Sequence, residues 1–213
     1  MQQQTEVLPR RSVEPLFDGG MALFFLSVWL APGAFGPADE LIRAAMVIMM
    51  LEFILIHATG FLGFTAFAPG ITREKKLKTM ALFSGFYLIF LLGIGSALGA
   101  GWPILAFFWL LAGKLRIALR REVPDEFRRK QMVSDWTRSL YCYIGCAFVS
   151  VLGPVVPRLG ISPELQPEFG EDTSGIWIDY PHGVVAMGVL YFTIMAIVKL
   201  RASGKTRPAG QKA

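Results

Sequence analysis

Long apolar blocks separated by short charged segments are the feature of this chain that most limits its fold. Of its 213 residues, 54% are hydrophobic and 17% are charged. Ordinary soluble domains have about 25% charged residues. A helix needs roughly 20 apolar residues to cross a bilayer, and the blocks approach that length. The pattern therefore predicts an all-α, polytopic membrane protein.

Six apolar segments are candidate transmembrane helices. The first is the weakest, because Asp18, Gly19 and Gly20 lie near its start; if it is re-entrant, five crossings remain. A short cytoplasmic segment (residues 1–15) would precede the bundle (residues 16–200), and a basic cytoplasmic tail (residues 201–213) would follow it. The expected spans are residues 16–35, 41–68, 80–98, 102–119, 139–156 and 182–200.

The basic residues predict how these helices are oriented. With six crossings and a cytoplasmic N-terminus, 19 of the 21 Lys and Arg residues fall on the cytoplasmic side, and only Arg43 and Arg158 do not. The outer connection, residues 157–181, is acidic instead. Cytoplasmic connections of membrane proteins are rich in Lys and Arg, so both chain ends are expected inside. The expected location is a plasma membrane, or the inner membrane if the source is bacterial.

The same orientation accounts for the formal net charge of +5, so nucleic acid is not expected as a partner. The basic connection Lys114–Arg138 would instead meet anionic lipid at the cytoplasmic surface. Within it, Pro124-Asp125-Glu126 begins either a surface-lying helix that leads into the fifth span or a solvated charged linker.

Glu52 and His57 most need an explanation, because both lie inside the second apolar segment. A rise of about 1.5 Å per residue puts Glu52 roughly 16 Å from the outer end of that span, and His57 deeper. An ionised carboxylate there costs a few kcal/mol or more, so Glu52 is expected to be protonated or to face a partner inside the bundle. Intramembrane ionisable groups are functional candidates by default. The sequence therefore predicts a buried polar site at Glu52.

Helical periodicity predicts that Glu52 and His57 face different neighbours, since five residues correspond to a rotation of about 140°. Thr59 shares the stripe of Glu52. Arg43 lies roughly 13 Å from Glu52 along the axis, so it would reach Glu52 only with a side chain extended along the helix. The candidate residues of the polar site are Glu52, His57, Thr59 and Arg43.

Glycines mark candidate contacts between helices. Gly95 and Gly99 form a GxxxG pattern in the third span, and Gly60 and Gly63 lie in the second. Small residues let membrane helices approach closely. Packing within one subunit is the first interpretation of the GxxxG pair, and a homo- or hetero-oligomer contact is the alternative.

No cofactor is expected from the remaining residues. Cys142 and Cys146 lie at i and i+4 on one helix face, at a depth similar to that of His57, which leaves a soft-metal site as the minor alternative to helix packing. A b-type haem held by His57 and His182 is disfavoured, because their levels differ by roughly 15–20 Å.

These observations predict a small, non-catalytic integral membrane protein of transport-related or accessory type, with its polar site at Glu52. One alternative is a membrane-embedded enzyme or redox subunit that uses Glu52 and His57 with outer residues such as Asp179 and His182. Another is a structural subunit of a larger membrane complex.

Overall fold

The computed structural model describes residues 14–119, 126–167 and 174–205, and their regular structure is entirely helical. The all-α expectation is therefore confirmed for these residues. Most of the N-terminal segment and of the tail, and parts of the inner and outer connections, lie outside the described residues. The elements are α1 Glu14–Leu30, α2 Ala38–Phe67, α3 Arg73–Leu98, α4 Trp102–Leu119, α5 Glu126–Val151, η1 Gly153–Val155, η2 Pro163–Leu165, α6 Ile176–Asp179 and α7 Pro181–Lys205.

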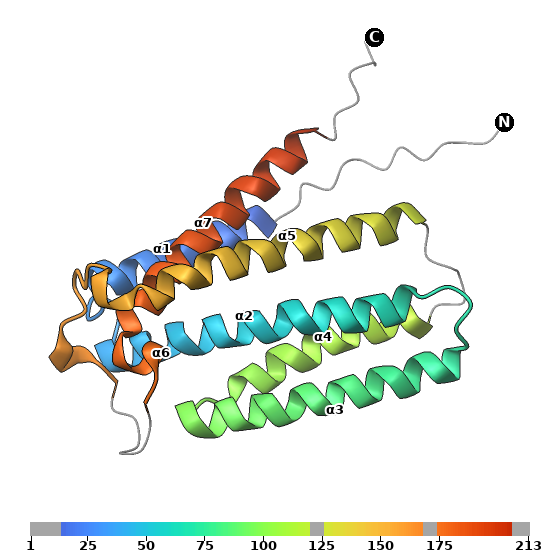
Figure 1. Ribbon diagram of the computed structural model, residues 1–213, viewed down its shortest axis with the longest axis horizontal. Helices are drawn as coiled ribbons and strands as arrows, with labels where there is room; N and C mark the ends of the chain where they lie inside the picture. Colours follow the sequence, from blue (N-terminus) through green and yellow to red (C-terminus); the bar gives the residue numbers. More distant parts are fainter. Residues whose placement is uncertain (1–13, 120–125, 168–173, 206–213) are drawn as a thin grey trace, which may run out of the picture.

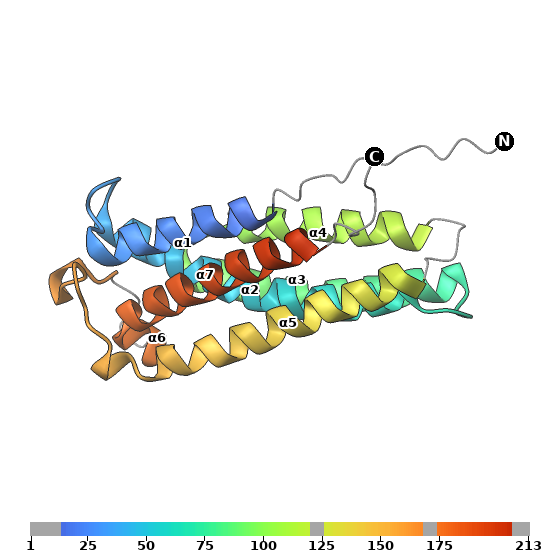
Figure 2. The same ribbon diagram turned by 90° about the horizontal axis from the view of Figure 1, so that it is seen from above.

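The long helices form two layers that meet at α2 (Figure 1). One layer contains α1, α5 and α7, and the other contains α2, α3 and α4. Successive long helices run in opposite directions, as the two views show (Figure 1, Figure 2). The start of α1 and the end of α7 are consequently directed toward the end of the bundle that holds the connection from α2 to α3, although both stop short of it.

Two apolar clusters form the core, and α2 contributes to both. Ala45, Met46 and Met49 of α2 pack with α1, α5 and α7, whereas Leu51 and Leu62 pack with α3 and α4. A helix that is apolar on all sides is one that is covered on all sides. The continuous apolar run of α2 is therefore explained by its place between the two layers.

Three helices are long and apolar enough to cross a membrane, and they occupy Ala38–Phe67, Arg73–Ala97 and Pro181–Ala202. Shorter apolar helical stretches occur at Pro15–Leu30 and Trp102–Gly113. Large apolar side chains also cover the outside of the bundle; Trp109 of α4 is 85% exposed and Leu82 of α3 is 73% exposed. An apolar surface of this kind suits contact with lipid rather than water.

Several helices differ at their ends from the expected spans, most clearly α1 and α5. The first span was expected to reach residue 35, but α1 ends at Leu30 and Pro32-Gly33 lies in the following turn, since proline cannot donate a helical hydrogen bond. The fifth was expected at residues 139–156, but α5 is one continuous helix from Glu126 to Val151. The first half of α5 lies along α2 instead of forming a separate surface helix. The Trp136 indole holds it there by donating to the Ile56 carbonyl at 2.9 Å.

The described part of the outer connection forms an ordered cap on the end of α1. The Gly160 amide donates to the Trp29 carbonyl at 2.9 Å, and the Trp29 indole donates to the Pro157 carbonyl, also at 2.9 Å. A Cβ atom at position 160 would lie 2.2 Å from the Leu30 carbonyl oxygen, so only glycine fits this approach. The loop after α5 is therefore held to α1 by two hydrogen bonds whose acceptors are backbone carbonyls.

Gly188 allows α7 to pack against α1, and we predict that Gly188→Ala destabilises the protein. An added Cβ would lie 2.2 Å from the ring of Phe25, which is fully buried. Overpacking of this kind costs about 1–3 kcal/mol, and thermal unfolding in detergent should show a lower Tm.

Gly85→Ala is the matched control, because a Cβ at position 85 of α3 meets nothing within 4 Å. Its Tm should be unchanged or higher, since alanine favours helix more than glycine does. Equal Tm values for the two variants would contradict the close α1–α7 contact.

Candidate functional site

Glu52 lies near the middle of α2 and faces α7. The Tyr191 hydroxyl donates a hydrogen bond to Glu52 Oε1 at 2.6 Å. Tyr191 is 1% exposed, whereas Glu52 is half-buried. Since α2 contains 30 residues and is about 45 Å long, the carboxyl is roughly 20 Å from either end of the helix. The bond thus joins two membrane-length helices at mid-depth.

Two hydrogen bonds from α5 flank this position. The Tyr143 hydroxyl donates to the Met49 carbonyl at 2.8 Å, and the Trp136 indole donates to the Ile56 carbonyl. Gly60 makes the second contact feasible, because a Cβ there would lie 2.6 Å from the indole nitrogen. Each bond uses a free lone pair of a helical carbonyl, which lets a polar side chain stay satisfied among apolar neighbours.

Aromatic rings line the site. The Tyr143 and Tyr191 rings meet edge to face, with centroids 5.5 Å apart, and Phe192 lies 5.0 Å from Tyr191. Phe53 contacts Tyr143 at 5.7 Å. Edge-to-face pairs are favourable and orient their rings, so the two tyrosine hydroxyls are held in fixed directions toward α2.

His57 makes contacts separate from those of Glu52. Its Nδ1 donates to the Phe53 carbonyl at 2.9 Å, one turn back along α2. Its ring centroid lies 4.1 Å from that of Phe53. Nδ1 therefore carries a proton, because a carbonyl can only accept.

The other predicted residues of α2 are placed as follows. Thr59 is half-buried and Gly63 is buried. Arg43 lies at the outer end of the helix, where a Cβ at Gly99 would come within 3.9 Å of its Nη1. The structure therefore does not bring Arg43 to Glu52.

Cys142 and Cys146 lie on α5 and hydrogen-bond each other; Cys146 is buried and Cys142 is half-buried. The soft-metal alternative required His57 to join them. Among the described residues, however, no three His, Cys, Asp or Glu side chains converge as metal ligands would. The two thiols instead pack in the apolar cluster that α5 shares with its neighbours.

His182 is 1% exposed at the start of α7, and its Nε2 donates to the Gly153 carbonyl at 2.8 Å. Tyr191, which marks the level of Glu52, lies nine residues further on, or roughly 13 Å along the axis. Asp179, at the end of α6, is exposed. The residues of the enzyme alternative are therefore distributed over different levels of the bundle.

Gly95 and Gly99 lie at the end of α3. Gly99 adopts a left-handed conformation, with φ of 65°, and the Ala100 amide donates to the Gly95 carbonyl at 2.9 Å. A Cβ at position 95 would lie 2.8 Å from the Ala100 carbonyl oxygen. This arrangement is a glycine-terminated helix end, so the GxxxG spacing here serves the turn between α3 and α4.

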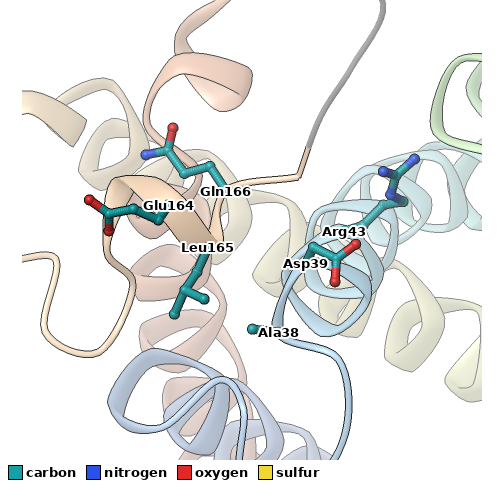
Figure 3. A pocket seen from close by; sticks show the side chains of 6 residues that line it. All are labelled: Ala38, Asp39, Arg43, Glu164, Leu165 and Gln166. Atoms are coloured by element: carbon teal, nitrogen blue, oxygen red, sulfur yellow. The ribbon is translucent and has the colours of Figure 1, made fainter.

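A polar cavity of about 510 Å³ opens between the start of α2 and η2 (Figure 3). The Glu164 carboxylate points away from this space. A hydrogen bond with Ser162 lowers the pKa of the exposed Glu164 carboxyl below its usual value. The cavity is lined by Ala38, Asp39, Arg43, Glu164, Leu165 and Gln166.

An ion pair that the sequence reasoning missed joins the first turns of α1 to the last turns of α7. Lys199 Nζ lies 2.7 Å from Asp18 Oδ2, and the two side chains are 30% and 14% exposed. The sequence analysis places Asp18 near the start of the weak first span and Lys199 at the end of the sixth, without pairing them. Their similar distance from the cytoplasmic ends of two antiparallel spans was the signal that could have paired them.

Comparison of the chain with protein-family models, curated proteins and solved structures finds no match in any of the three. The class of protein defined by the fold is a helical bundle with membrane-length helices and polar contacts between them.

We predict that Tyr191→Phe destabilises the bundle, because it removes the donor to Glu52. Hydrogen bonds between membrane helices are worth about 0.6–2 kcal/mol, so the loss should fall in this range in an unfolding titration with SDS. Tyr141→Phe is the matched control, since Tyr141 lies on α5 and is 71% exposed. If both variants unfolded alike, the Glu52–Tyr191 contact would contribute nothing.

Proposed function

We propose that the chain crosses the membrane six times, with both ends in the cytoplasm. The support is that 19 of the 21 Lys and Arg residues fall in the segments expected on one side of the membrane, while the connection at residues 157–181 is acidic. The alternating helix directions require an even number of crossings if α1 spans fully (Figure 1).

We further propose a non-catalytic, transport-related membrane protein in which Glu52 binds and releases a proton. The observation that carries this proposal is the Tyr191–Glu52 hydrogen bond at mid-depth between two membrane-length helices. An ionised carboxylate is costly at this depth, so its protonation state responds strongly to its surroundings. A proton reaches this carboxyl when the surrounding helices shift slightly.

An enzyme would need Glu52, His57, Asp179 and His182 to act on a common substrate. His182 lies roughly 13 Å along α7 from Tyr191, which binds Glu52, and it is already bonded to the Gly153 carbonyl. Both observations favour a non-catalytic protein.

An accessory subunit of a larger complex is the second candidate. The exposed aromatic and aliphatic side chains of α3 and α4, such as Trp109 and Leu82, favour it, because a partner helix could replace lipid there.

Anionic lipid is the proposed partner at the inner end. The described cations there include Lys130, which also forms an exposed ion pair with Glu126 at 3.0 Å. Exposed pairs of this kind are weak, so lipid phosphates can compete for the cations.

Reporter fusions test the topology. A fluorescent protein fused after residue 213 should fluoresce, and alkaline phosphatase fused there should be inactive, because both report a cytoplasmic end. Phosphatase inserted after Pro157 should be active. The reverse pattern at either site would contradict six crossings with both ends inside.

Proton uptake into proteoliposomes tests the function. A potassium–valinomycin potential, negative inside, should drive faster acidification of a trapped pH dye than in empty liposomes. Glu52→Gln should reduce the rate to that of empty liposomes, since the amide cannot release a proton. Glu40→Gln, in the exposed first turn of α2, should leave the rate unchanged.

Equal uptake by the wild type and Glu52→Gln would exclude Glu52 as the proton site. Uptake by the wild type no faster than that of empty liposomes would contradict the transport proposal and favour the accessory role.

A further inference from the structure

The Asp18–Lys199 ion pair lies on the same side of α7 as the Glu52 site. Tyr191 and Lys199 are eight residues apart, which corresponds to roughly 12 Å along the axis and a rotation of only about 80°. Tyr191 binds Glu52 at 2.6 Å and Lys199 binds Asp18 at 2.7 Å. One helix therefore carries both polar contacts, one to α2 and one to α1.

Glu52 is within the electrostatic reach of this pair. The charged groups that act on it are Lys199 of α7 and Asp18 of α1, and Tyr191 of α7 and Tyr143 of α5 face it as neutral polar groups. Cys142 of α5 in turn faces Tyr191. α4 also packs against α2. Its sequence contains no Asp, Glu, His, Cys or Tyr, and its two basic residues, Lys114 and Arg116, occur near its C-terminal end.

The charges balance only when one proton is present. Two carboxylates and one ammonium are neutral overall if Glu52 is protonated and carry one negative charge if it is not. Net charge in a low-dielectric interior is costly, and unlike charges attract strongly there. Loss of the proton from Glu52 therefore draws the Lys199 ammonium toward Glu52 and weakens its contact with Asp18.

We propose that Lys199 is a counter-ion shared by Asp18 and Glu52, and that it couples the protonation of Glu52 to the contact between α1 and α7. α1 packs mainly against α7 and only slightly against α2, so the inner turns of α1 depend on this contact. With Glu52 protonated, Lys199 holds α1 closed. With Glu52 ionised, α1 loosens. The inference rests on the proposed function, because it takes Glu52 to be the proton site.

Hydrogen exchange in lipid nanodiscs tests the coupling. After correction for the intrinsic pH dependence of amide exchange, the rate over residues 14–22 should rise at least about fivefold as pH rises through the titration of Glu52, since allosteric couplings span about 5–150-fold. Glu52→Gln should keep the rate low at every pH. Lys199→Arg should retain this rise in exchange rate with pH, here called the pH step, and Lys199→Gln should abolish it.

Arg201→Gln is the matched control, because Arg201 is exposed at the same end of α7, and it should behave as the wild type. If Lys199→Gln does not fold, Asp18→Asn decides instead. It leaves Lys199 with Glu52 alone, so exchange should be high and independent of pH.

If the ion pair is merely structural, exchange in the wild type shows no pH step. That result overturns the inference. A step that survives in Glu52→Gln overturns it too. If the step is absent while Glu52-dependent proton uptake persists, this coupling fails alone; if that uptake is absent, the proposed function fails.

Discussion

A carboxyl group at mid-depth in a helical bundle must have a polar partner, and the contact of Glu52 with Tyr191 meets this requirement. The contact ties the helix shared by both layers to the last helix of the chain. It also sets the rotation of α7, because Tyr191 can reach Glu52 from one face only. Phe192 and Met187 are then directed into the cluster shared with α1, where Gly188 accommodates Phe25.

α7 carries a polar contact at each of three levels. His182 binds the Gly153 carbonyl at the outer end, Tyr191 binds Glu52 at mid-depth, and Lys199 binds Asp18 toward the inner end. Apolar packing between helices in lipid gives little selectivity, since lipid chains are as apolar as leucine. Three separated polar contacts, to three different parts of the chain, fix the depth and rotation of α7 more sharply. They also place the charged pair where it can respond to Glu52.

The sequence could predict features that depend on local periodicity. The apolar blocks, the helical class and the position of Glu52 along α2 follow from residues close together in the chain. Helix ends were less predictable. Pro32-Gly33 was included in the first span although the helix stops before it, and α5 was divided although Trp136 keeps it straight against α2. The GxxxG spacing of Gly95 and Gly99 suits both helix packing and a helix end, and only backbone geometry separates the two.

By itself, the sequence determined that the chain is helical, that its apolar segments suit a membrane, and that Glu52 and His57 point in different directions. Rise and rotation per residue decide these properties, and both are local. Only the tertiary structure decided which groups meet. Tyr191 is 139 residues from Glu52, and Tyr143 is 94 residues from Met49. Lys199 and Asp18 belong to the last and the first long helix of the chain. Such pairs depend on how helices pack side by side, which no local pattern records.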